Sequence, residues 1–129
     1  MTLAARILVG VMALFFGAMG LGFWLNLETQ AAGFGLQAAV DAANLIGRAS
    51  VRADFGSFFL TVGLLCAYAA WKRCGSAAVG AALLFGIALL GRLVSVILDG
   101  SAPGGTPPML VEAVSVAVLL WARGVWKKA

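Results

Sequence analysis

Four long apolar runs constrain this chain more than any other feature of its sequence. They cover about residues 7–25, 52–71, 77–98 and 108–126. Each is close to the roughly 20 residues that a helix needs to cross the hydrocarbon core of a bilayer. In lipid, every backbone polar group must find its partner within its own segment, so such runs form helices. The sequence therefore predicts an all-α fold, an integral membrane bundle of four transmembrane helices.

The composition supports lipid as the solvent for most of the surface. Hydrophobic residues make up 63% of the chain and charged residues 11%, whereas a soluble domain is roughly 45–50% apolar and about 25% charged. A small soluble domain could not bury this surplus, because much of its surface stays in water. With 129 residues, we expect a single transmembrane domain over residues 1–129.

The first connection, residues 26–50, is unusually long for a compact domain. Apolar and small residues recur in it at helical spacing, with polar residues beside them. They are Leu36, Val40, Ala43 and Gly47. This pattern predicts a short amphipathic helix in the first outer loop, lying on the membrane surface or over the mouth of the bundle.

Small residues also recur within the apolar runs. They are Gly10, Ala13 and Gly17 in the first run and Gly80, Gly86 and Gly91 in the third. In lipid, small residues let helix backbones approach closely. We therefore expect these positions to mark close helix packing.

Basic residues lie mostly on one side of the predicted membrane. Six of the nine flank the same ends of the runs: Arg6, Lys72, Arg73, Arg123, Lys127 and Lys128. The opposite connections carry only Arg48 and Arg52. Because cytoplasmic loops are enriched in Lys and Arg, the sequence predicts a multi-pass protein with both the N- and the C-terminus in the cytoplasm.

Several kinds of site have little support in the sequence. The chain has no histidine, and its two cysteines, Cys66 and Cys74, do not have the spacing of a zinc site or a disulfide framework. The basic residues do not form a stripe of the kind that binds nucleic acid. We predict no metal site, no cofactor and no nucleic-acid partner.

Charged residues within or beside the apolar runs carry the most information about function. They are Arg52, Asp54, Arg92, Asp99 and Glu112. The helical rise places Asp54 and Arg92 roughly 26 Å, and Glu112 roughly 22 Å, from the inner interface. Charges facing lipid at such depth cost several kcal/mol, so these groups should face inward and pair. With Ser95, which shares a helical stripe with Arg92 and Asp99, they are predicted to form one polar cluster in the outer leaflet.

The predicted cluster has three acids and two arginines. The surplus negative charge must be protonated, hydrated, or held for a cationic or hydrogen-bonding ligand. Three interpretations remain open: a structural network that fixes helix register, a polar pocket that binds a small amphiphile, and a proton or ion path. The path is the least favoured, because no charges continue into the inner half of the runs.

Two sequence strings that contain these charges resemble a known family. Residues 52–60 read RADFGSFFL and residues 91–100 read GRLVSVILDG, and Glu112 stands early in the last run. They resemble small bacterial four-helix membrane proteins catalogued as a domain of unknown function, similar in layout to DoxX-like proteins. Ser57 departs from the pattern, where a second glycine is expected. The resemblance implies the four-helix fold and the bacterial inner (plasma) membrane, and it implies no established activity.

Two function classes follow from these observations. The first is a site for a lipid, quinone or other small amphiphile among membrane lipids. The alternative is an accessory or interaction subunit of a larger membrane protein complex, or a homo-oligomer. Transport ranks lower, because the charges lie away from the midplane. The serines have no histidine or lysine partner to activate them, so a conventional enzyme is not expected and the catalytic residues, if any, are unknown.

Overall fold

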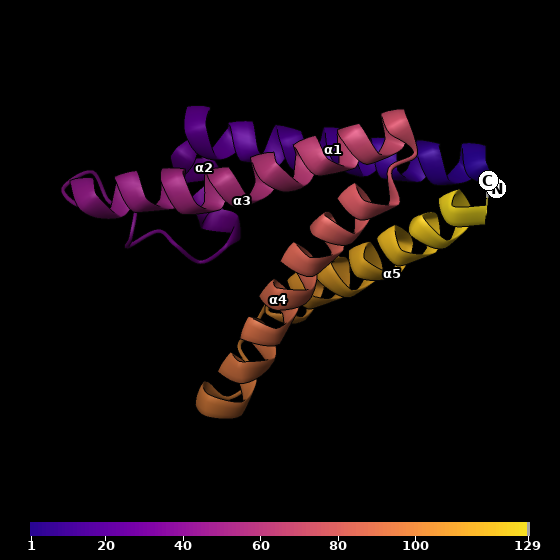
Figure 1. Cartoon of the computed structure of the whole chain (residues 1–129). Coiled ribbons are helices and arrows are strands. Elements are labelled where there is room, and N and C mark those ends of the chain that lie inside the picture. The colour runs from indigo at the N-terminus through magenta and orange to yellow at the C-terminus, as the bar shows by residue number, and fades with distance from the viewer. Residues whose placement is uncertain (129) are drawn as a thin grey trace. The chain divides into compact units, whose positions relative to one another are not determined.

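A computed structural model describes residues 1–128 of the chain, and these form five helices without a strand. The helices are α1 (Thr2–Leu25), α2 (Leu27–Gly33), α3 (Leu45–Lys72), α4 (Gly75–Asp99) and α5 (Thr106–Lys128) (Figure 1). All but α2 are long and apolar enough to cross a membrane. The predicted all-α fold with four long apolar helices is therefore confirmed.

The chain divides into two compact units, which are described separately. The first unit contains Met1–Gly10 and Leu65–Ala129, and the second contains Val11–Leu64. The single domain expected over residues 1–129 stays a prediction.

In the second unit, α1 and α3 approach each other through small residues. A Cβ atom added to Gly63 would lie 2.8 Å from the backbone nitrogen and 2.9 Å from the Cα of Gly17. One turn along, a Cβ added to Gly20 would meet Leu60 at 2.7 Å. The two backbones can approach this closely because Gly63 carries no side chain, whereas a Cβ added to Gly17 itself would meet nothing within 4 Å.

An aromatic cluster fills the same unit where the long connection returns to the helices. The ring of Phe23, on α1, lies 5.5 Å from Phe34, 5.4 Å from Phe55 and 5.8 Å from Phe59, measured between centroids. Phe23 is fully buried. Buried aromatic side chains contribute large apolar contact areas. Because Phe34 directly follows α2 while Phe55 and Phe59 lie on α3, the cluster fastens the connection to both helices.

The short helix of this connection does not lie where the spacing predicted it. The helix is α2, whereas residues 37–40 and 42–43 form turns. Gly35 has a positive φ of 72°, in the left-handed region that favours glycine. Because this conformation is not helical, the helix does not continue from α2 into these turns. The periodic residues from Leu36 onward therefore follow turn geometry, and only Gly47 lies in a helix.

The second long helix starts at Leu45, seven residues before the expected 52. The side chain of Asn44 explains this start, because its Oδ1 accepts a hydrogen bond of 2.9 Å from the N–H of Gly47. Such a bond satisfies one of the free N–H groups in the first turn of a helix. Residues 45–51, which the sequence placed mainly in the first connection, form the first turns of α3.

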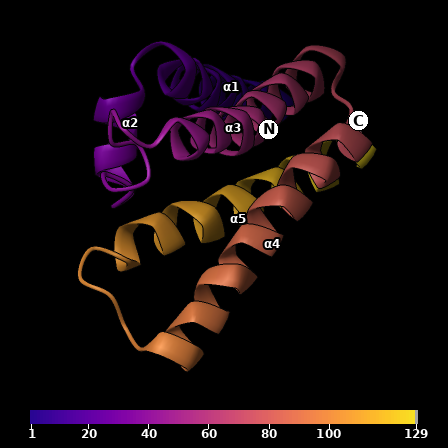
Figure 2. The same ribbon diagram turned by 90° about the vertical axis from the view of Figure 1, so that its left-hand side faces the viewer.

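In the first unit, α4 and α5 pack as an antiparallel pair. Their buried faces consist mainly of small and apolar residues: Ala78, Ala81, Ala82 and Phe85 on α4, and Leu119 and Ala122 on α5. Figure 2 shows the two helices close together near the C-terminus and diverging toward their connection at residues 100–105. Gly100, with φ of 88°, ends α4, and its N–H donates to the carbonyl of Val96.

The turn between α3 and α4 is short, with only residues 73 and 74 between the two helices. Arg73 adopts a positive φ of 52°, and the N–H of Cys74 donates to the carbonyl of Ala69 at 3.0 Å, which closes the end of α3. Helices commonly end in this way, usually with glycine at the left-handed position. Nearby, the Nε of Arg6 donates to the carbonyl of Ala70 at 3.0 Å, so the start of α1 lies beside the end of α3.

Candidate functional site

An ion pair joins α4 and α5 in the half of the first unit where the helices begin to diverge. The Nε of Arg92 donates to Oε1 of Glu112 over 2.7 Å. Glu112 is 7% exposed, while the side chain of Arg92 is 35% exposed. Helical spacing produces this arrangement. The buried stripe of α5 contains Glu112, Ser115, Leu119, Ala122 and Trp126.

The second carboxylate oxygen of Glu112 lacks a partner. Its Oε2 is buried and accepts no hydrogen bond from the described residues. Buried polar atoms are nearly always paired, and an unpaired one is costly. Arg92 likewise uses one of its five N–H donors here, because the structure shows no other hydrogen bond or ion pair for it within residues 1–128. The pair therefore has both an acceptor and donors to offer to a further group.

Ser95 and Asp99 do not join the ion pair. Both side chains are exposed on α4, beyond Arg92. Neither makes a hydrogen bond or ion pair with a side chain in the described part of the chain. Of the three residues on the predicted stripe of α4, only Arg92 therefore pairs with an acid among the described residues of the first unit.

Arg52 and Asp54 belong to the second unit, and Arg52 pairs with a tryptophan. The indole N–H of Trp24 donates to the carbonyl of Arg52 at 3.2 Å, and the Nε of Arg52 donates to the carbonyl of Trp24 at a longer 3.4 Å. Trp24 lies in the last turn of α1, where carbonyl groups have no partner within the helix. Asp54 is exposed. The single cluster predicted from all six residues stays a prediction.

These contacts give a physical reason for the RADFG string. Arg52 bonds to the end of α1, and Phe55 packs against Phe23. Gly56 lies directly under the indole of Trp24, where a Cβ atom would overlap the ring. The residues of this string therefore pack α3 against the end of α1. Asp54 has no part in this arrangement.

A second ion pair, which was not predicted from the sequence, holds the long connection in place. The Nη2 of Arg48 lies 2.6 Å from Oε1 of Glu28, and its Nη1 donates to the carbonyl of Val40 at 2.7 Å. The hydrogen bond from Arg48 lowers the pKa of Glu28 below its ordinary value. One signal was available: Glu28 is the only acid near the start of a connection that also contains Arg48.

Metal binding and a nucleophile have little basis in the described residues. Across residues 1–128, no three His, Cys, Asp or Glu side chains lie close enough to hold a metal ion. Cys66 is buried in the apolar interior, where a thiol is unreactive. The Arg92–Glu112 pair is thus the strongest candidate site within the first unit, and its chemistry is that of hydrogen bonding and charge.

Comparisons with known proteins identify a family. The chain matches the family model described as "Domain of unknown function (DUF4345)" over residues 4–123. No curated protein and no solved structure matches it. The matched region contains all four long apolar helices in whole or in large part, together with both strings discussed above. On this evidence the chain belongs to the family of the domain of unknown function DUF4345.

Proposed function

We propose that this protein is a multi-pass membrane protein that binds a small amphiphile, such as a lipid or a quinone, at the Arg92–Glu112 pair. The unpartnered, buried Oε2 of Glu112 is the observation that carries the proposal. Water does not readily reach a carboxylate within a span, so a ligand hydroxyl or ammonium group is the natural donor. A ligand carbonyl or phosphate oxygen would suit the remaining donors of Arg92.

The surroundings of the pair fit the apolar part of such a ligand. Beyond Arg92, exposed apolar side chains line the last turns of α4, among them Leu93 and Val96, and Leu110 and Val111 are exposed on α5 before Glu112. A site with apolar walls and a few convergent polar groups is typical of small-molecule pockets. No catalytic step is part of the proposal.

Native mass spectrometry on protein extracted gently from its own membranes tests this function. The wild type is expected to carry a small bound mass, and Glu112→Gln to lose it, because the amide keeps the shape of the side chain but not its charge. Asp54→Asn is the matched control, since it neutralises an exposed acid of the other unit, and it should retain the adduct. An adduct that is equally abundant in Glu112→Gln would contradict the assignment.

The alternative function is that of an accessory or interaction subunit. It is favoured by the open surface of α4, where a Cβ atom added to Gly86 or Gly91 would meet nothing within 4 Å. Neighbouring Ile87 and Leu90 are exposed. A partner helix could approach closely along such a surface. The same mass spectra separate the two functions, because a larger assembly without a small adduct supports the subunit and a monomer counts against it.

The proposed orientation places both chain ends in the cytoplasm of a bacterial inner membrane, with the first connection and α2 on the outer side. It rests on the basic residues at the α3–α4 end and on the resemblance to small bacterial membrane proteins. The similarity in layout to DoxX-like proteins stays a prediction and supplies no activity. The side chain of Lys128, which also entered the charge count, lies outside the described residues.

Cys74 offers a direct test of this orientation. It is partly exposed at the α3–α4 turn, whereas Cys66 is buried. The Ser76 hydroxyl and nearby backbone N–H groups lower the pKa of the Cys74 thiol, which favours its reactive thiolate form. A membrane-impermeant maleimide should label Cys74 in inverted vesicles and not in intact cells. Labelling in intact cells that is lost in Cys74→Ser would reverse the orientation.

A further inference from the structure

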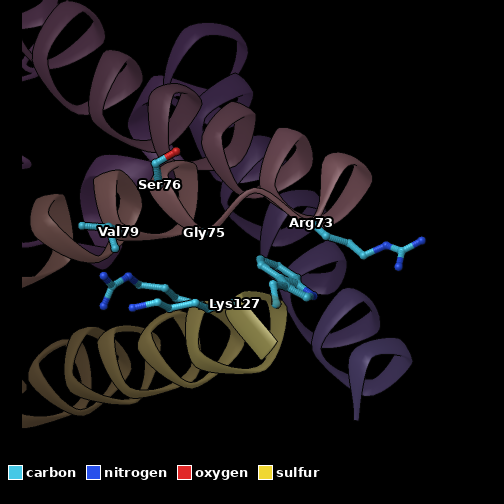
Figure 3. A pocket seen from close by; sticks show the side chains of 7 residues that line it. Arg73, Gly75, Ser76, Val79 and Lys127 are labelled. Carbon is cyan, nitrogen blue, oxygen red and sulfur yellow. The ribbon is translucent and has the colours of Figure 1, made fainter. Parts of the chain in front are cut away.

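A basic pocket lies at the opposite end of the α4–α5 pair from the Arg92–Glu112 pair. Its volume is about 440 Å³, within the range of small-molecule sites. Its polar lining comes from the α3–α4 turn, the first turn of α4 and the end of α5 (Figure 3). The residues that matter here are Arg73, Gly75, Ser76, Arg123, Trp126 and Lys127.

Positive charge predominates among the described residues that line this pocket. Three of its lining residues are basic and none is acidic. The only acids of the first unit are Asp99 and Glu112. Asp99 ends α4 roughly 36 Å from Gly75, and Glu112 precedes Arg123 on α5 by roughly 16 Å. The N-terminus of α4 adds partial positive charge, while the C-terminus of α5 offsets part of it.

The aliphatic part of one basic side chain, Arg123, packs against the start of α4. A Cβ atom added to Gly75 would lie 3.3 Å from Cγ of Arg123, so the aliphatic part of Arg123 rests on the first turn of α4. Lys127 follows Arg123 by one helical turn and shares its face of α5. In Figure 3 the Lys127 side chain extends toward the Val79 side of the pocket, whereas Arg73 extends away from it. Arg123 and Lys127 are therefore the two cations that a bound group would meet.

A second observation concerns the tryptophan that lines this pocket. Trp126 lines the pocket and is 7% exposed, yet its indole N–H has no hydrogen-bond partner in the described part of the chain. Buried tryptophan N–H groups usually find an acceptor. The pocket thus combines cations with one unpartnered indole N–H, and none of its described lining residues is acidic.

We infer that the basic pocket binds a phosphate group, as carried by the headgroup of an anionic phospholipid or by free phosphate. Arg and Lys at a helix N-terminus are a common setting for phosphate. A phospholipid headgroup is the favoured source, because the neighbouring end of α3 has the features of a membrane interface. Trp71 and Tyr68 are exposed there, and Lys72 lies 4.3 Å from the centre of the Trp71 ring. This site does not depend on the function proposed for Glu112.

The test compares lipid binding by the full-length protein and matched variants. Native mass spectrometry measures the affinity for phosphatidylglycerol added to detergent-solubilised protein. Arg123→Gln combined with Lys127→Gln should weaken binding at least about tenfold, as the loss of two charge-assisted hydrogen bonds implies. Lys72→Gln removes one charge at the same end without lining the pocket, and it should change the affinity less than about twofold. Equal weakening in both variants, or none in either, would overturn the inference.

Two further measurements complete the test. Trp126→Phe keeps the aromatic ring and removes only the N–H, so a loss of about threefold in affinity is expected even if the double variant does not fold. Inorganic phosphate distinguishes the two sources. If inorganic phosphate raises the melting temperature of the wild type but not of the double variant, and phosphatidylglycerol has no further effect, the pocket binds free phosphate. If phosphatidylglycerol alone stabilises the wild type, the source is lipid, and stabilisation by neither overturns the site.

Discussion

Arg92→Ala is expected to lower the free energy of unfolding by about 3 kcal/mol, because it leaves the buried carboxylate of Glu112 without its partner. This figure is at the low end for buried ion pairs, since the Arg92 side chain is one-third exposed. Ser57→Ala is the control. Ser57 is an exposed polar residue on α3, and its removal should change stability by less than about 0.5 kcal/mol. Thermal unfolding in mild detergent measures both.

A double variant separates the charge from the contact area. When both partners of a buried pair are replaced by apolar residues, much of the stability returns, because no charge is left unpaired. Arg92→Ala with Glu112→Ala should therefore be more stable than Arg92→Ala alone. If Arg92→Ala melts like Ser57→Ala, the pair contributes nothing to the fold, and the structural interpretation of the charges is wrong.

Gly63→Ala should destabilise the second unit by about 1–3 kcal/mol, although alanine is the better helix former. The new methyl group would lie within 3.0 Å of backbone atoms of Gly17, and backbone cannot rotate out of the way as a side chain can. The helices α1 and α3 would have to separate. Thermal unfolding and the yield of folded protein report this effect.

Gly86→Ala is the matched control for Gly63→Ala. It makes the same chemical change on a long apolar helix, but the new methyl group meets nothing within 4 Å. The helix propensity of alanine then acts alone, and a gain of about 0.5–1 kcal/mol is expected. Equal effects of the two substitutions would mean that α1 and α3 do not approach through Gly63.

The sequence predicted the long helices well because lipid leaves them few alternatives. Apolar length sets each span, and turn residues such as Gly100 end it. The residue spacing could not distinguish the first turns of this helix from the preceding loop. The sequence therefore placed the helix start near 52, whereas α3 begins at Leu45. The decisive signal was the capping side chain of Asn44, which is visible in the sequence only once the helix start is suspected.

The close packing expected at the glycines occurs at some of them and not at others. At Gly17 the expected close packing occurs, and its partner is Gly63. At Gly86 and Gly91 the structure leaves open space beside the helix. A small residue indicates where a backbone can approach and does not specify which backbone will, so the pairing had to come from the structure.

The partners of the charged residues were also beyond the sequence. Helical spacing places Arg92 and Glu112 at comparable depth, yet three acids compete for two arginines in such a prediction. The structure pairs Arg92 with Glu112, and it gives Arg52 a backbone carbonyl at the end of α1. Ends of helices offer unpaired carbonyl groups that no count of charges includes. For this reason a carboxylate was expected as the partner of Arg52, whereas the structure gives it the backbone carbonyl of Trp24.

The measurement that tests the proposed function most directly is an experimental structure of the protein in its own lipids, with attention to Oε2 of Glu112. If the proposed site exists, extra density is expected between α4 and α5, with a polar atom at hydrogen-bond distance from Oε2 and an apolar portion along Leu93 and Val96. An Oε2 that accepts its hydrogen bond from a side chain of this protein, with no ligand density beside it, would contradict the binding site and leave the ion pair a purely structural device.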